Sequence, residues 1–103
     1  MKSFHEILRE SREKNGLLLR EVSSKLQIDQ ALISKFESGN RKPTRAQVIQ
    51  LARYYDTDKE ELLVQWMSEK VVYELRNEEF ADEILKVAEQ KMRYLSKSKN
   101  EKA

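Results

Sequence analysis

Glycine and proline are scarce in this chain, and their scarcity limits the folds that it can form. The 103 residues include only Gly16, Gly39 and Pro43 of these two types. Tight hairpin turns depend on glycine and related residues, and no run of alternating β-branched residues indicates a strand. The long intervals around these three positions are rich in helix-forming residues. The sequence therefore predicts an all-α fold.

The composition indicates a soluble helical protein with one small domain and an extension. Hydrophobic residues make up 39% of the chain and charged residues 37%, which is typical of helices with long solvated faces. A chain of this length is too short for two independent cores of ordinary size. Cysteine is absent, which excludes disulfides and thiolate metal sites and permits a cytoplasmic location. The longest apolar runs, such as Leu17 to Leu19, are far shorter than a membrane span, so we expect no membrane partner.

The charges are distributed unevenly along the chain. Residues 1–57 carry 11 Lys and Arg against 7 Asp and Glu, a balance of +4, whereas residues 58–103 carry 9 against 11, a balance of −2. A basic half beside an acidic half suggests a polyanionic partner, although such a balance is also common in proteins that bind nothing charged.

Apolar residues recur at helical spacing and divide the chain into six predicted helices. Candidate caps mark several starts, such as Ser3 with Glu6 three residues later, and Gly39 suits the end of the third helix. The helices are predicted from Ser3 to Gly16, Leu18 to Leu26, Asp29 to Ser38, Thr44 to Tyr55, Thr57 or Asp58 to Met67 or beyond, and Glu78 to Ser96. The predicted core comprises Phe4, Leu8, Val22, Leu26, Ile28, Ile33, Phe36, Val48, Leu51, Ala52, Tyr55, Leu62, Leu63, Trp66 and Met67.

The last predicted helix carries an apolar stripe close to heptad spacing. The stripe comprises Phe80 or Ala81, Ile84, Leu85, Ala88, Met92 and Leu95. Because such a stripe is unfavourable in water, this helix either folds back on the preceding helices or pairs with a second chain. The polar residues 97–103 are predicted to form a disordered tail.

Two of the predicted helices, Leu18 to Leu26 and Asp29 to Ser38, are separated by a short turn, as in a helix-turn-helix. The stretch LRESREKNGLLLREVSSKLQIDQALISKFESGNRKP, above all its ISKFESGNRKP portion, resembles the phage-repressor-like regulators. This is the lambda repressor and Cro type, also called the xenobiotic-response-element family. The resemblance covers about Phe4 to Trp66.

The resemblance implies a five-helix DNA-binding domain over residues 1–67. The apolar stripe makes the helical extension over residues 68–96 a candidate dimerisation element. Regulators of this kind usually bind palindromic operators in double-stranded DNA as homodimers. The resemblance therefore implies a bacterial or phage transcription regulator, with repressor or autoregulator favoured over activator.

The resemblance assigns base recognition to the second motif helix, which lies in the major groove in such proteins. The residues that it places at the bases are Gln30, Ala31, Leu32, Ser34 and Lys35. Gln30 can pair with adenine, and Lys35 can approach guanine or a phosphate. Ala31 or Leu32 can contact a thymine methyl group. The alternative is that these are ordinary solvated helix residues.

The resemblance places phosphate contacts in the basic loop that follows this helix. The residues are Asn40, Arg41, Lys42 and Thr44, and Arg45 can join them. A basic loop beside a helix N-terminus favours anions, whereas a solvated loop with incidental charge is the alternative. Arg12 and Glu37 match a structural ion pair between the first helix and the second motif helix.

The sequence departs from the family pattern at two places. Leu18 and Leu19 stand where relatives place a capping Ser or Thr and a phosphate-contacting Gln, so we expect Arg20 to replace that phosphate contact. Gln27 stands where a turn glycine is common. Because a positive φ strains a residue other than glycine, the turn is expected to differ there.

The sequence gives little support to an enzymatic function. His5, the only histidine, lies in a charged helix and is expected to be solvated rather than a general base. No glycine-rich phosphate loop, metal-ligand spacing or nucleophile motif is present. We therefore expect no catalysis and no cofactor, and the sequence identifies no small-molecule effector.

One alternative function belongs to a different class. It is a protein-interaction module on a helix-turn-helix scaffold that has lost DNA binding. An exposed patch of Leu18, Leu19 and Leu32 would favour it. Within the DNA-binding class, a restriction-modification controller and an antitoxin are both compatible with the size of the chain.

Overall fold

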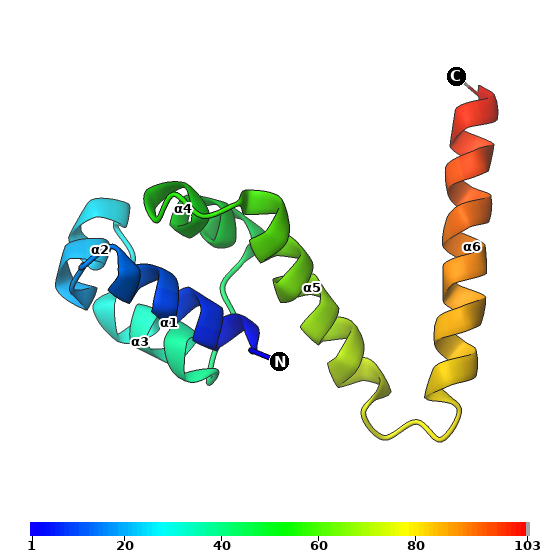
Figure 1. Ribbon diagram of the computed structural model, residues 1–103, viewed down its shortest axis with the longest axis horizontal. Helices are drawn as coiled ribbons and strands as arrows, with labels where there is room; N and C mark the ends of the chain where they lie inside the picture. The colour runs from blue at the N-terminus through cyan, green and yellow to red at the C-terminus, as the bar shows by residue number, and fades with distance from the viewer. Residues whose placement is uncertain (103) are drawn as a thin grey trace. The chain divides into compact units, whose positions relative to one another are not determined.

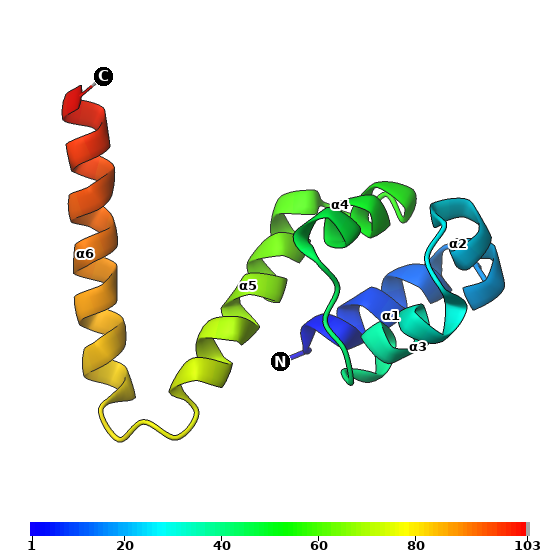
Figure 2. The same cartoon turned by 180° about the vertical axis from the view of Figure 1, so that it is seen from behind.

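The computed structural model describes the backbone of residues 1–102 and the side chains of residues 1–97. Within this range the chain forms six helices and no strand, which confirms the all-α prediction (Figures 1 and 2). The chain divides into two compact units, one from Met1 to Lys70 and one that begins at Val71. None of the described helices is long and apolar enough to cross a lipid bilayer.

The first unit contains four complete helices and most of a fifth (Figure 1). α1 spans Phe4–Lys14, α2 Leu19–Leu26, α3 Gln30–Ser38, α4 Arg45–Tyr54 and α5 Lys59–Leu75. These bounds agree with the predicted helices to within two residues at every start. At its C-terminal end α5 continues beyond Met67 to Leu75, as the prediction allows, and so enters the second unit.

Polar side chains cap the N-termini of four of these helices by accepting backbone hydrogen bonds. The caps are Ser3 for α1, Asp29 for α3, Thr44 for α4 and Asp58 for α5. Each cap of this type typically stabilises a helix by about 0.5–2 kcal/mol. α2 differs, because its cap residue Leu18 has no side-chain acceptor. Instead, the Glu21 carboxylate accepts the Leu18 N–H at 3.0 Å.

The apolar faces of these helices form one core. Its buried members are Phe4, Leu8, Val22, Ile28, Ile33, Phe36, Val48, Leu51, Ala52, Tyr55, Leu62 and Trp66. Leu26 and Leu63 pack against this core and are half-buried. The core prediction is wrong at Met67, which is 44% exposed. Met67 follows the buried Trp66 directly, so it points about 100° away around the helix.

The turn between α2 and α3 keeps a left-handed residue without glycine. Gln27 has φ 58° and ψ 42°, and its side-chain Nε2 donates to the Ser24 carbonyl at 3.0 Å. The expectation of a different turn is therefore wrong. Ser23 Oγ also donates to the Ile28 carbonyl at 2.6 Å, which holds the buried Ile28 in place after the strained residue.

The second unit consists of the end of α5 and α6, Ala81–Lys102. The predicted start at Glu78 is three residues early, because the Glu78 N–H donates to the Leu75 carbonyl at 3.0 Å and closes a turn. The tail predicted from Lys97 is helical as far as Lys102, and Ala103 lies outside the described residues. No glycine or proline follows Pro43, so no helix breaker ends α6 earlier.

Candidate nucleic-acid interface

α3 has one face in the core and one face in solvent. Ile33 and Phe36 are buried on the inner face. The residues exposed on the outer face are Gln30, Ala31, Ser34 and Lys35. Their spacing of three and four residues places them along one side of the helix. The fifth predicted base-contacting residue, Leu32, is half-buried and packs against the core.

A bidentate ion pair fixes α3 to α1. Arg12 donates from Nε to one Glu37 oxygen at 2.7 Å and from Nη2 to the other at 2.9 Å, and its Nη1 donates to the Leu17 carbonyl at 2.8 Å. The two side chains are only 14% and 7% exposed. The hydrogen bonds to Glu37 raise the pKa of Arg12 above its ordinary value. This ion pair therefore fixes the position of α3 against α1, and its two side chains lie apart from the exposed outer face of α3.

The Tyr55 side chain adds a buried polar group to the core. Burial raises the pKa of the Tyr55 hydroxyl, and the negative charge of Glu37 raises it further. The hydroxyl oxygen has no hydrogen-bond partner among the described residues. Tyr55 therefore stays protonated beside the ion pair, as a packing residue rather than an acid or base.

Gly39 ends α3 and is constrained in two ways. Its φ of 84° lies in the left-handed region that favours glycine. A Cβ atom at this position would also approach the His5 Nδ1 atom to 3.0 Å. His5, expected to be solvated, is instead half-buried, with its Nδ1 3.1 Å from Ser3 Oγ. The imidazole thus packs the start of α1 against the end of α3.

The basic loop that follows presents side chains rather than backbone amides. Asn40 and Arg41 are exposed, but their N–H groups both donate to the Lys35 carbonyl, at 3.0 and 3.3 Å. The Thr44 N–H donates to the Gln47 side chain at 2.9 Å. The N–H groups of these three residues are therefore engaged within the protein and do not point to a phosphate. The side chains of Arg41 and of the exposed Arg45 remain directed to solvent.

Two residues of α5 brace this loop. The buried Trp66 donates from Nε1 to the Pro43 carbonyl at 2.9 Å. Glu69 accepts a hydrogen bond from Lys42 Nζ at 2.9 Å and another from the backbone N–H of Phe4. Burial acts to raise the pKa of Glu69, but these hydrogen bonds outweigh it and lower the pKa. Lys42 is therefore held by a carboxylate in this structure, unlike Arg41.

These braces were not predicted from the sequence. Trp66 lies 23 residues from Pro43 in the chain, and Glu69 lies 65 residues from Phe4. Neither separation corresponds to a helical repeat or a capping pattern, so no local signal indicates the contact. The apolar pattern of α5 predicts that Trp66 is buried. A buried tryptophan usually has a hydrogen-bond partner for its indole N–H, but the pattern does not identify that partner.

The three leucines of the alternative function do not form an exposed patch. Leu19 and Leu32 are half-buried against the core, and Leu18 alone is exposed, at 50%. Arg20, on the first turn of α2, is exposed and extends the set of solvent-directed basic residues.

Comparison with protein families gives one match. The model of a family described as "Helix-turn-helix domain" matches residues 6–65, more than half of the chain. Neither the curated proteins nor the solved structures that were compared with the chain gave a match. The matched segment contains α2, the Gln27 turn and α3, together with the helices that form their core. The chain belongs to the helix-turn-helix domain family.

Proposed function

We propose that this protein is a sequence-specific transcription regulator of the lambda repressor and Cro type, from a bacterium or phage. It binds double-stranded DNA as a homodimer and acts in the cytoplasm as a repressor or autoregulator. The observation that carries the proposal is the exposed polar face of α3, followed directly by a basic loop. Membership of the helix-turn-helix family supports DNA binding.

In this proposal the outer face of α3 reads bases in the major groove. Gln30 pairs with adenine through its amide, and Lys35 approaches guanine O6 and N7. Ala31 contacts a thymine methyl group, and Ser34 hydrogen-bonds to a base edge. Leu32 is less accessible, so it contributes at the margin of the interface. Each good side-chain pair with a base supplies about 1–3 kcal/mol of discrimination.

Phosphate contacts come from the side chains around α3. Arg41 and Arg45 are the strongest candidates because both are exposed and no described hydrogen bond engages their guanidinium groups. Arg20, Asn40 and the Thr44 hydroxyl are further candidates. Lys42 can contribute only where it leaves Glu69 or shares its charge with a phosphate. The +4 balance of residues 1–57 gives this half of the chain the sign that DNA requires.

A selection of bound duplexes from a random pool tests base reading. The wild type, Gln30→Ala and Lys35→Ala are compared with Gln90→Ala and Lys59→Ala, which remove the same side-chain types from exposed positions outside the proposed interface. Each α3 variant is expected to relax the consensus at its own position in both half-sites, and the controls are expected to leave it unchanged. An unchanged consensus with uniformly weaker binding would reassign both residues to phosphate contacts.

A salt titration with random duplex tests the electrostatic part. Binding is expected to weaken steeply as salt rises, because phosphate contacts release counterions. Arg41→Ala should lower the slope by about one unit, while Lys59→Ala should leave it unchanged. Absence of binding at low salt would overturn the regulator proposal. Leu19 and Leu32 pack against the core, so the leucine patch that would favour the protein-interaction module is not formed.

A further inference from the structure

We propose that α6 pairs with α6 of a second copy of this chain in an antiparallel orientation. The inference deepens the homodimer proposed above and rests on that dimer, but it does not rest on DNA binding. It specifies which surface joins the two chains and in which direction they run. Its basis is an apolar face and a charge gradient, both on the same helix.

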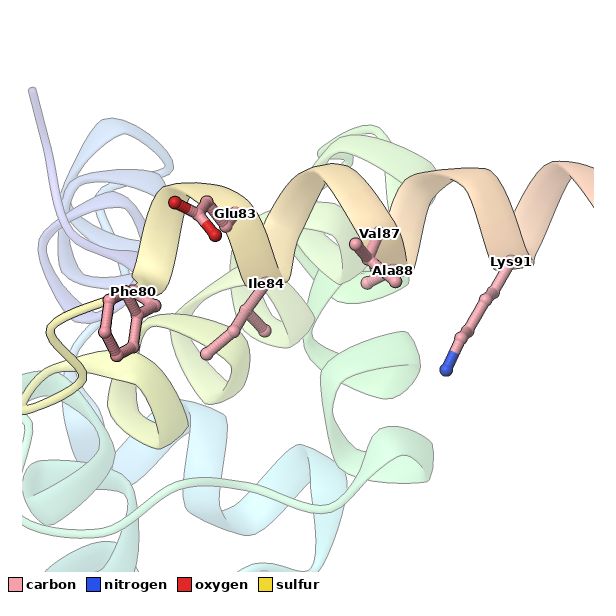
Figure 3. Close-up of a pocket in the computed structure, with 6 residues that line it drawn as sticks. All are labelled: Phe80, Glu83, Ile84, Val87, Ala88 and Lys91. Carbon is pink, nitrogen blue, oxygen red and sulfur yellow. The ribbon is translucent and has the colours of Figure 1, made fainter.

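The apolar face of α6 is broad and continuous. The exposed apolar residues of this helix and its first turn are Phe80, Ile84, Leu85, Val87, Met92, Tyr94 and Leu95. At about 100° per residue they span roughly half of the helix circumference. Figure 3 shows that Phe80, Ile84 and Lys91 point to the same side of the helix. Together with Glu83, Val87 and Ala88, they line a shallow groove. An apolar face of this width is unfavourable in water, so we expect it to pack against another helix.

The charges of this segment change sign along its length. The N-terminal part carries only acidic residues, which are Glu78, Glu79, Asp82 and Glu83. From residue 86 to residue 97 the charged residues are Lys86, Glu89, Lys91, Arg93 and Lys97. The only acidic member, Glu89, pairs with Arg93 in the same helix at 2.6 Å. The helix is thus acidic at its start and basic toward its C-terminal end.

This gradient selects a second copy in one orientation. In a parallel pair, each acidic part would lie against another acidic part and each basic part against another basic part. In an antiparallel pair, the acidic start of each helix lies against the basic end of its partner, and the helix dipoles also oppose each other. Lys91, which lies within the apolar face, is then near the acidic start of the partner rather than near a second Lys91.

The oligomeric state, measured by sedimentation of the full chain without DNA, tests the surface. Val87→Asp, halfway along the length of the apolar face, is expected to raise the dimer dissociation constant at least tenfold. Lys86→Gln changes the net charge by the same amount on the neighbouring polar side, and it is expected to have a much smaller effect. Circular dichroism checks that both variants stay helical. A monomer at all concentrations, as expected if α6 folds back on its own chain, would overturn the proposal, as would a dimer unaffected by Val87→Asp.

Spin labels outside the apolar face, which stays wild type, test the orientation. The chain has no cysteine, so Ser96→Cys and Lys86→Cys each give a single attachment site. With a rise of 1.5 Å per residue and a centre near Ala88, antiparallel pairing places two labels at Ser96 about 24 Å apart along the axis and two at Lys86 about 6 Å apart. Parallel pairing would give no axial offset between the two labels at either position. That result would overturn the orientation.

A charge exchange tests the electrostatic argument. Acidic residues in the first turn also stabilise an isolated helix through its dipole. A helical circular dichroism signal therefore does not show that two α6 helices pair. Asp82→Lys/Glu83→Lys is expected to dissociate the dimer, and mixing it with Lys91→Glu/Arg93→Glu is expected to restore a mixed dimer. Failure of the mixture to associate would contradict the proposal. Because all these measurements omit DNA, failure of α6 pairing and failure of DNA recognition are distinguishable.

Discussion

Glu37 of α3 receives two parallel hydrogen bonds from the guanidinium group of Arg12 in α1, and both side chains are largely withdrawn from solvent. Removal of one partner leaves the other charge buried and unpaired. Glu37→Ala or Arg12→Ala is therefore expected to lower the free energy of unfolding by about 3–5 kcal/mol. Urea unfolding of the full chain measures this difference.

The exposed pair Arg9 and Glu13 provides the matched control for this prediction. The two side chains are 2.8 Å apart on the surface of α1. Exposed ion pairs at this spacing contribute about 0.3–0.5 kcal/mol, so Arg9→Ala should change stability far less than Arg12→Ala. Equal effects of the two substitutions would show that Arg12 and Glu37 are not a buried unit.

Gly39→Ala is expected to be more destabilising than Gly16→Ala. Both glycines have positive φ, 84° and 65°, so both substitutions introduce the left-handed strain of about 1–2 kcal/mol. Only at Gly39 does the added Cβ also meet the His5 ring, whereas nothing lies within 4 Å at Gly16. The double variant Gly39→Ala/His5→Ala should recover the steric part of the loss. Equal unfolding free energies for the two single variants would contradict the His5 contact.

Trp66→Phe is expected to loosen the basic loop. The substitution keeps an aromatic ring in the core but leaves the Pro43 carbonyl without its indole donor at 2.9 Å. Loss of a buried hydrogen-bond partner costs about 1–3 kcal/mol. DNA affinity should also fall, through less well positioned phosphate contacts, with an unchanged base consensus. Hydrogen exchange of the loop amides measures the local effect, and unchanged exchange at Asn40 and Arg41 would contradict it.

The contribution of Glu69 to stability is expected to depend on pH. Although burial acts to raise its pKa, the hydrogen bonds from the Phe4 N–H and from Lys42 lower it below the ordinary value of 4.5. Because the folded-state pKa is the lower one, the contribution is complete above the ordinary value and is lost as the pH falls through the folded value. The stability difference between the wild type and Glu69→Gln should therefore shrink from pH 7 to pH 3.

Glu74→Gln is the control for this pH dependence. Glu74 is an exposed carboxylate on the same helix, and no described hydrogen bond or ion pair engages it. At pH 7 its substitution should change the free energy of unfolding far less than Glu69→Gln does. A Glu69→Gln curve parallel to the wild-type curve over the whole range would contradict the role assigned to Glu69.

The features that the sequence predicts well are those with local causes. Ser3, Asp29 and Thr44 cap helices because their side chains reach amides two or three residues away, which a spacing rule captures. The buried face of α3 follows in the same way from the period of Ile33 and Phe36.

The braces of the basic loop join distant segments, and no local pattern in the sequence predicts them. The bonds from Trp66 to Pro43 and from Phe4 to Glu69 depend on how α5 packs against the loop and α1. The preference of residues other than glycine for negative φ also led to a wrong prediction at Gln27, which keeps the left-handed conformation. There the buried Ile28 and the bond from Ser23 hold a conformation that intrinsic preference disfavours. Tertiary packing therefore determines both the hydrogen bonds that brace the loop and the left-handed conformation of Gln27 between the two motif helices.

The position of Trp66 also gives the protein an intrinsic optical reporter. It is the only tryptophan in the chain, only 4% of its surface is exposed, and Lys70 Nζ lies 3.6 Å from its ring centroid. Its indole is hydrogen-bonded at the base of the loop that we expect to hold phosphates. Its fluorescence emission should therefore follow both the unfolding of the first unit and the engagement of that loop by DNA, without any added dye.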